Sequence, residues 1–260
     1  MGYPYPFLCA LFGSDRDAKC ILKFLCPLRT VLPFTIVILL VSSAWSQIDD
    51  FHYFYEPRPL GAGDNVFNLG LSFSLLPAPI VEQEIPAPAI DLQFKHGFSP
   101  HLSGYGSLST NFFTNVLIGG LQYNIGDEDL SFSVGDGLAF FAGYLDLGGE
   151  FDKNTAAAIA DVPVLRIGHK FESVALSISM AVTYVLYADT HVGSLEDKGL
   201  RYRVNDIYFT LAFEQPFFGR TCISTGISVT YSRTPYQIWM LYNVFDQYLI
   251  IPEFFFSFHL

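Results

Sequence analysis

Apolar and polar residues alternate with a period of two along most of the chain beyond residue 64. In the clearest stretch, 173–187, the even positions from Val174 to Leu186 are all apolar, whereas the odd positions from Ser173 to Thr183 are Ser, Ala or Thr. Successive side chains of a β-strand point to opposite faces, so this pattern predicts strands with one apolar face. The same reading predicts ten strands, at about 65–76, 87–96, 102–112, 115–125, 129–144, 160–171, 173–187, 202–214, 220–232 and 247–260.

One charged residue interrupts the apolar face of a predicted strand. Asp136 falls on the apolar side of the 129–144 segment, between two glycines. Glycine permits the local conformation of a β-bulge, which would re-aim this side chain. The sequence therefore predicts a bulge at Asp136.

The connections between the predicted strands alternate in length. Short turns follow the second, fourth, sixth and eighth strands, whereas long connections occupy 77–86, 145–159, 188–201 and 233–246. An even number of strands with this rhythm is typical of transmembrane β-barrels, which have tight periplasmic turns and longer outer loops.

The residues opposite the apolar face distinguish a membrane barrel from a soluble one. A soluble barrel needs charged residues on its outer polar face, but here that face is mostly Ser, Gly, Ala and Thr, and charged residues make up 15% of the chain. The apolar face carries tyrosines toward the strand ends, as lipid-facing aromatic girdles do. These are Tyr123, Tyr144, Tyr184, Tyr231 and Tyr248. The prediction is an all-β, transmembrane antiparallel β-barrel of about ten strands; a secreted soluble barrel is the alternative.

The chain ends in "PEFFFSFHL", with Phe254, Phe256, Phe258 and Leu260 on one face of the last predicted strand. In a membrane barrel, lipid would cover these side chains and the strand would pair with 65–76 to close the barrel. The tail also resembles the C-terminal signal of bacterial outer-membrane barrels, although it ends in leucine and not in an aromatic residue. The resemblance implies that the barrel-assembly machinery recognises these four residues.

A second resemblance lies at the start of the predicted barrel. "RPLGAGDNVF", from Arg58 to Phe67, resembles the Arg-x-x-Gly-x-Gly opening of some outer-membrane barrels of Bacteroidetes-like bacteria. Together the two resemblances imply a Gram-negative outer membrane as the location and outer-membrane lipid as the surroundings.

The N-terminal region has the pattern of a signal peptide. Basic residues precede an apolar core at 30–41, and Ala44 and Ser46 are small residues at the positions before a cut ahead of Gln47. A membrane anchor that is never cleaved is the alternative. The predicted organisation is 1–46 as N-terminal extension and signal peptide, 47–64 as a periplasmic N-terminal segment and 65–260 as the transmembrane barrel.

Charge and cysteine content exclude some functions. The formal net charge is −11, which argues against nucleic acid as a partner because phosphate binding needs clustered positive charge. Only Cys222 lies beyond the predicted leader, so no internal disulfide framework is expected, and Cys222 is interpreted as a small buried side chain.

The sequence contains no motif for a cofactor or a metal. It has no nucleotide-binding loop, no zinc-ligand spacing and no Gly-x-Ser-x-Gly elbow. Asp189 and His191, in the loop predicted after 173–187, resemble the Asp-x-His of omptin proteases, and Glu82 and Glu84 would have to supply the partner acids. The alternative function is therefore an enzyme at the extracellular rim, either an omptin-like protease or a lipid-modifying hydrolase; a solvated loop is the simpler explanation of the pair and is preferred.

Two further sets of charged residues are candidates for binding. The lumen-facing candidates are Asp91, Lys95, Arg166, Asp206, Glu214 and Glu253. Charges inside a narrow barrel must pair or meet water, so these residues predict either an ion-pair network that plugs the lumen or a path for a small polar ligand or ion. The outer-loop acids, which could bind lipopolysaccharide through divalent cations, are Glu82, Glu84, Asp146, Glu150, Asp152, Asp189, Glu196, Asp197 and Asp246.

A ten-stranded barrel has a bore closer to the filled eight-stranded barrels than to the open porins. The sequence therefore predicts an outer-membrane barrel with a structural, adhesive or minor-transport role and a narrow or plugged lumen, without enzymatic activity.

Overall fold

The computed structural model describes residues 53–77, 85–111, 113–127, 129–146, 154–192, 195–197, 204–218, 221–233 and 248–259. All of them belong to the compact unit Trp45–Leu260; a separate unit comprises Met1–Ala44. The strands are β1 (Asn65–Leu76), β2 (Ile85–Gly97), β3 (Leu102–Thr110), β4 (Thr114–Gly126), β5 (Leu130–Leu145), β6 (Asn154–Asp161), β7 (Val164–Phe171), β8 (Val174–Val192), β9 (Leu195–Asp197), β10 (Val204–Phe218), β11 (Thr221–Ser232) and β12 (Leu249–His259). Within these ranges, no helix is long and apolar enough to cross a membrane.

The strands form one closed antiparallel barrel. Neighbours in the sheet follow chain order from β10 through β12 and β1 to β5, and β10 also pairs with β8, which closes the circle. β6 and β7 are consecutive pieces of a single barrel position, because both lie between β5 and β8. With β9 attached only to β8, the barrel has ten strand positions, which confirms the predicted fold class.

The outside of the barrel is apolar and the inside is polar. On β1 the outward Phe67 and Leu71 are 54% and 50% exposed, whereas the inward Asn68 and Ser72 are 3% and 2% exposed. This is the inverse of a soluble barrel, and it suits a solvent of lipid. Tyr123, Tyr144 and Tyr231 are also exposed near strand ends, as in the aromatic girdles of membrane barrels.

The C-terminal strand closes the barrel as predicted. β12 pairs with β11 on one side and with β1 on the other, and Phe254, Phe256 and Phe258 lie opposite Phe73, Leu71 and Leu69 of β1. The three phenylalanines therefore share the outward face of β1, while Ser257 and His259 point inward and are buried. Leu260 lies outside the described residues.

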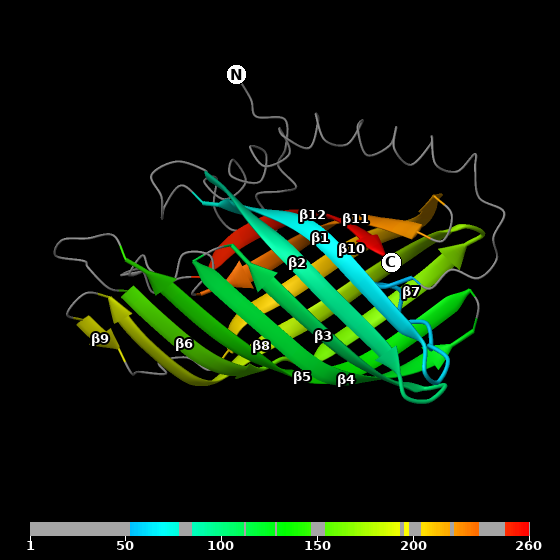
Figure 1. Cartoon of the computed structure of the whole chain (residues 1–260), viewed down its shortest axis with the longest axis horizontal. Helices are drawn as coiled ribbons and strands as arrows, with labels where there is room; N and C mark the ends of the chain where they lie inside the picture. Colours follow the sequence, from blue (N-terminus) through cyan, green and yellow to red (C-terminus); the bar gives the residue numbers. More distant parts are fainter. Residues whose placement is uncertain are drawn as a thin grey trace, which may run out of the picture. The chain divides into compact units, whose positions relative to one another are not determined.

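The two ends of the barrel differ in their connections. Short turns join β2 to β3, β4 to β5, β7 to β8 and β10 to β11, and β1 begins and β12 ends beside them. We call this the short-turn end; it lies at the right of Figure 1, and the opposite end is the long-loop end. The predicted alternation of short and long connections is confirmed except after the third strand, where residues 111–113 join β3 to β4 at the long-loop end.

The structure corrects three local predictions. The bulge at Asp136 is wrong: the register of β5 with β4 runs without a shift through Leu121 and Asp136. Asp136 keeps its outward position and accepts a 3.0 Å hydrogen bond from the backbone N–H of Gly137, so no change of strand direction is needed to satisfy the carboxylate. The sixth strand begins at Asn154, not at 160, and is broken at Pro163, which has no N–H to donate. β8 continues to Val192.

Candidate functional site: a lumen closed by the chain's own N-terminal segment

The residues that precede β1 lie inside the barrel at the short-turn end. Residues 53–60, here called the plug, contact inward-facing side chains on several strands around the barrel wall. Tyr53 packs with Ala175 of β8 and Cys222 of β11, and the Tyr55 ring lies 5.0 Å from that of Phe255 on β12. These partners lie on one side of the barrel, whereas Lys95 of β2 binds the plug from the other side, so the plug crosses the lumen.

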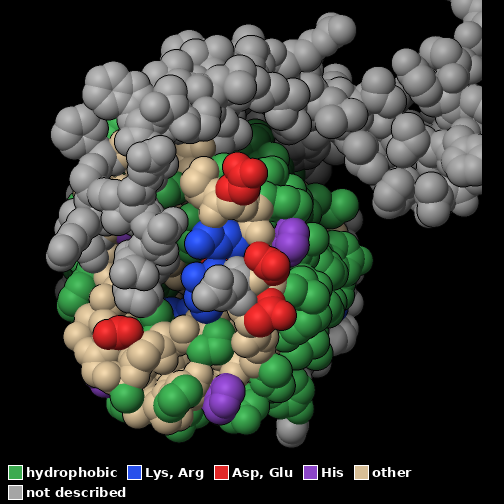
Figure 2. Space-filling model, turned by 90° about the vertical axis from the view of Figure 1, so that its right-hand side faces the viewer, with side chains coloured by type: hydrophobic (Ala, Val, Ile, Leu, Met, Phe, Trp, Pro, Cys, Tyr) green, Lys and Arg blue, Asp and Glu red, His purple; other side chains and the backbone are tan. Residues whose placement is uncertain are grey.

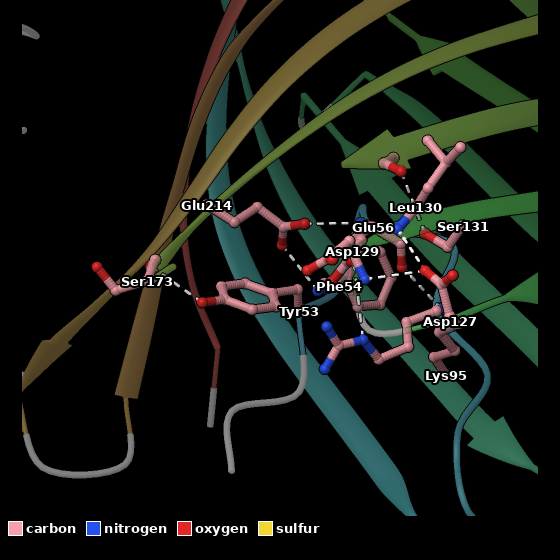
Figure 3. Close-up of polar contacts among 12 residues, drawn as sticks. Tyr53, Phe54, Glu56, Lys95, Asp127, Asp129, Leu130, Ser131, Ser173 and Glu214 are labelled. Atoms are coloured by element: carbon pink, nitrogen blue, oxygen red, sulfur yellow. Dashed lines mark hydrogen bonds and ion pairs between the residues drawn. The ribbon is translucent and has the colours of Figure 1, made fainter. Parts of the chain in front are cut away.

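Glu214 on β10 is the main anchor of the plug (Figure 3). Its Oε1 accepts a 2.7 Å hydrogen bond from the backbone N–H of Phe54, and its Oε2 accepts a 2.6 Å bond from that of Glu56. The hydroxyl of Ser224 donates a third bond at 3.1 Å. A buried backbone N–H without a partner destabilises the fold, and a bond to a charged acceptor is stronger than a neutral one. The fully buried Glu214 carboxylate therefore satisfies two amides that would otherwise have no partner.

His259 lies beside the same carboxylate. Its Nε2 is 2.5 Å from the Ser224 hydroxyl and 3.4 Å from Glu214 Oε1. Because Ser224 and Glu214 both meet the same ring nitrogen, this is not the geometry of a Ser–His–acid catalytic triad, in which the acid binds the other nitrogen. The cluster therefore positions Glu214 for the plug.

The opposite wall of the lumen also holds the plug. Lys95 on β2 is fully buried and donates a 3.3 Å hydrogen bond from Nζ to the backbone oxygen of Glu56. Within the plug, Arg58 Nε lies 3.8 Å from Glu56 Oε1. On β7, a Cβ at Gly168 would lie 2.6 Å from Pro57 Cδ, so a residue without a side chain is needed to admit the plug.

The short-turn end has a mixed charge distribution. Figure 2 looks onto this end and shows Lys and Arg side chains gathered near its centre, with Asp and Glu side chains around them and apolar side chains on the flank. Arg58, Lys95 and Lys170 are the described lysines and arginines closest to this end. In the turn between β4 and β5, Asp127 accepts hydrogen bonds from the backbone N–H groups of Leu130 and Asp129, and these bonds lower the pKa of its carboxyl.

Burial along the inner wall shows how far the plug reaches. On β8 the inward Ala175 and Ser177 are 0% and 4% exposed, but Ser179 and the inward residues after it are partly exposed. On β10 the inward Glu214 and Ala212 are 0% and 1% exposed, whereas Thr210 is partly exposed. Because these side chains point inward, the exposed ones border a solvent-accessible lumen beyond the plug.

The six lumen candidates do not form the ion-pair network considered from the sequence. Among the described residues, no ion pair joins any two of Asp91, Lys95, Arg166, Asp206, Glu214 and Glu253. The structure brings Lys95 and Glu214 together at the plug, and the other four lie elsewhere in the lumen. A segment of backbone, rather than a network of charges, fills this end of the barrel.

The three remaining acids lie among hydroxyl and amide groups of the wall. Glu253 accepts a 2.6 Å bond from Ser74, and Asp91 lies on β2 opposite Ser109 of β3 and diagonal to Ser72 of β1. Asp206 accepts bonds from Ser232, Asn205 and Tyr208. These contacts satisfy the carboxylates within the wall.

Arg166 on β7 lies over the Tyr105 ring of β3, with its Cζ 5.6 Å from the ring centre. It has no ion pair with a described carboxylate. This makes Arg166 different from the acids, which all have local partners.

The candidate pair at the rim is in a strand and not in a loop. Asp189 and His191 lie on β8, opposite Ala157 and Thr155 of β6, which are exposed. The pair therefore faces away from the lumen, with Asp189 Oδ1 3.6 Å from His191 Nδ1. Glu82 and Glu84, the acids that would complete the site, lie outside the described residues.

Of the outer-loop acids, Asp146 is the described residue that follows β5, and its Oδ2 lies 3.4 Å from the hydroxyl of Tyr144. Glu196 and Asp197 are in β9. Glu150, Asp152 and Asp246 lie outside the described residues. No group of three or more described His, Cys, Asp or Glu side chains could hold a metal ion.

The plug has no counterpart among the features predicted from the sequence. Tyr53, Phe54, Glu56 and Pro57 are each buried, yet they lie in a segment without strand periodicity. The available signal was the aromatic run Tyr53-Phe54-Tyr55 upstream of the first strand, because such side chains need a surface to cover them.

No model of a known protein family matches the chain, and no curated protein matches it in sequence. Solved structures that resemble it include the translocator domain of the autotransporter NalP from Neisseria meningitidis (8% identity, 77% of this chain and 88% of that chain, TM-score 0.38). A second is an outer-membrane channel from Pseudomonas putida F1 (8% identity, 82% of this chain and 100% of that chain, TM-score 0.40). A third is the outer-membrane protease OmpT from Escherichia coli (8% identity, 76% of this chain and 95% of that chain, TM-score 0.35). At these identities and scores they carry no argument about the residues of this chain.

The closed barrel, its apolar exterior and its polar interior define the class of protein. The chain is a β-barrel of the outer-membrane type, with ten strand positions and with residues 53–60 inside the lumen.

Proposed function

We propose that the protein is a minor-transport barrel of the outer membrane, with a narrow polar lumen for small solutes that the plug closes at the short-turn end. The observation that carries this proposal is the pair of hydrogen bonds from Phe54 and Glu56 to Glu214. The plug is held by hydrogen bonds and side-chain packing at one end, whereas the lumen beyond it is partly exposed. Displacement of residues 53–60 would open the barrel without rearranging its wall.

The location and organisation belong to the same proposal. Residues 1–46 direct export and are removed before Gln47, the barrel-assembly machinery inserts the chain through its C-terminal strand, and the short-turn end faces the periplasm. The apolar exterior and the closing position of β12 support this account.

Conductance of the purified full-length barrel in a planar lipid bilayer tests the function. Glu214→Gln replaces one acceptor oxygen with an NH2 group that faces a donor, so it should weaken the plug and raise the fraction of time in the conducting state. Asp206→Asn is the matched control, because Asp206 lies on the same strand and inner face but binds Asn205, Tyr208 and Ser232 of the wall and not the plug. If Glu214→Gln barrels do not conduct although the plug is shown to be displaced, the result would contradict transport and favour a purely structural role.

Asp189 and His191 support a second candidate, an enzyme at the long-loop end. The carboxylate lies 3.6 Å from the imidazole on the outer face, where it could orient the ring as a base. His191→Ala should abolish cleavage of an added peptide or lipid by intact cells if this function holds. Unchanged cleavage, or none by the unmodified protein, would eliminate it.

A further inference from the structure

The lumen beyond the plug contains a cation without a counter-ion. Arg166 points inward from β7 and is partly exposed, so its exposed surface faces the lumen. Neither Arg166 nor Lys95 forms an ion pair with a described carboxylate. The oxygens of the buried Glu214 carboxylate already accept bonds from the plug and Ser224. A cation deep in a protein destabilises the fold unless a negative charge compensates it.

A hydroxyl group beside the Arg166 guanidinium has no hydrogen-bond partner among the protein groups described. It is that of Tyr105, the tyrosine whose ring lies under the guanidinium. Ser133 of β5 is unpaired as well, but it lies opposite the backbone of Arg166, four residues along β5 from the Gly137 that Tyr105 Oη approaches. Buried hydroxyls in proteins are almost always hydrogen-bonded, so the unpaired Tyr105 hydroxyl beside a cation indicates an acceptor that both groups could bind.

Glycines in the barrel wall leave space for the ring of Tyr105 beside Arg166. A Cβ at Gly120 of β4 would lie 2.7 Å from Tyr105 Cζ, and one at Gly137 of β5 would lie 2.6 Å from Tyr105 Oη. The ring therefore lies flat against a wall without side chains, with Arg166 over its other face. Two strands lack inward side chains at the positions that would otherwise separate Tyr105 from Arg166.

From this geometry we infer that Arg166 and Tyr105 form a binding site for a small oxyanion, a carboxylate or a phosphate, that enters the lumen. The guanidinium offers two parallel N–H donors, which match the paired oxygens of either group, and the Tyr105 hydroxyl adds a donor at its side. Lys95, the cross-strand neighbour of Tyr105, adds positive potential from beneath the plug. The inference rests on the proposed function, because an anion reaches Arg166 only through the lumen.

Calorimetric titration of the full-length barrel in detergent micelles tests the site, with inorganic phosphate and acetate as separate probes. One of the two should bind at a single site, and the stronger binder identifies the group that is recognised. Arg166→Ala should weaken that binding by about tenfold or more, because bonds to charged groups are lost. The affinity of Arg166→Lys should lie between that of the unmodified barrel and that of Arg166→Ala, since lysine keeps the charge but loses the planar fork.

Arg233→Ala is the matched control. Arg233 also lies 5.6 Å over a tyrosine ring, that of Tyr248, but it follows the C-terminal end of β11 on the outward face with Tyr231. Its replacement should leave binding unchanged. Tyr105→Phe keeps the ring and removes only the hydroxyl, so it tests the site even if Arg166→Ala fails to fold; it should weaken binding by about fivefold.

Binding of neither probe, or binding that survives both Arg166→Ala and Tyr105→Phe in folded barrels, would overturn the site. The two proposals fail separately. Conductance in Glu214→Gln without anion binding eliminates only the anion site, whereas anion binding in a barrel that never conducts eliminates only transport.

Discussion

The carboxylate of Glu214 accepts a 2.6 Å hydrogen bond from the backbone N–H of Glu56, although the two residues lie 158 positions apart in the chain. This bond attaches the segment before the first strand to the eighth barrel position. Glu214 is fully buried, and so is Glu56. The same contact explains why a lumen lined by small polar residues is closed at one end.

Replacing Glu214 should expose Cys222. The thiol is 1% exposed and packs against Tyr53 of the plug, and Cys222 is the single cysteine beyond the predicted leader. Glu214→Ala removes two charge-assisted bonds to plug amides, so the rate of Cys222 labelling by a maleimide should rise by about tenfold or more. The measurement is the mass increase of folded barrels with time. In the Asp206→Asn control the rate should not change, and equal rates in both variants would show that Glu214 does not hold the plug.

An arginine should be tolerated inside the barrel but not outside. Ile178 on β8 is 50% exposed on the lipid-facing side, so Ile178→Arg should lower the free energy of unfolding by about 2–4 kcal/mol. Ser107 on β3 is partly exposed toward the lumen, and Asp91 lies diagonally from it on β2. Ser107→Arg should therefore destabilise less, as urea unfolding in lipid vesicles can measure. Equal losses would contradict the assignment of the two faces.

Removing Phe254–Leu260 should prevent barrel assembly. The deletion eliminates all pairs from Asn68–His259 to Phe73–Phe254 and leaves only Ser74–Glu253 between β1 and β12. Open strand edges in hydrocarbon cost several kcal/mol per unpaired group, so the truncated chain should be exported and then degraded. Cell fractionation and heat-modifiable gel mobility provide the measurement.

The matched variant replaces Phe254, Phe256 and Phe258 by leucine in the full-length chain. It keeps the β1–β12 seam and the apolar face but loses the aromatic character that resembles the assembly signal. Normal insertion of this variant would assign the defect of the truncation to the seam. A heat-modifiable truncated barrel at normal abundance would show that β12 is not needed for closure.

Acid should loosen the turn between β4 and β5. The backbone N–H groups of Asp129 and Leu130 lie 3.0 and 2.9 Å from Asp127 Oδ1 and lower its pKa. A folded-state pKa below the unfolded value of about 3.9 means that the carboxylate stabilises the turn above that pH, and that this contribution is lost as the pH falls through the folded pKa. NMR titration of the Asp127 carboxyl in micelles should find the lowered midpoint. In Asp127→Asn the turn amides should show no such titration, and a midpoint at or above 3.9 in the unmodified barrel would contradict the prediction.

The strands, their two faces and the closing role of the last strand could be predicted from the sequence. These features follow from a local rule: successive side chains of a strand alternate between two faces, so the residues from Val174 to Leu186 disclose which face meets lipid. The ten-strand count and the outward position of Phe254, Phe256 and Phe258 required no knowledge of distant partners. The register did require such knowledge, and this is why the bulge expected from the glycines beside Asp136 was wrong. β4 holds β5 in continuous pairing through Asp136, although on the other side the pairing passes from β7 to β6 at this point.

The contents of the lumen could not be predicted from the sequence, because they depend on contacts made across the closed barrel. Glu214, Lys95 and Arg166 have the same appearance in sequence, as single charges on a small polar face, but closure of the barrel gives them different partners. Glu214 and Lys95 meet the plug backbone, whereas Arg166 meets Tyr105 and no described carboxylate. The partners come from strands far apart in the chain, and the stagger of the closed sheet sets which of them face each other across the bore. A local pattern carries no information about that stagger, so the site could be seen only after the barrel had closed.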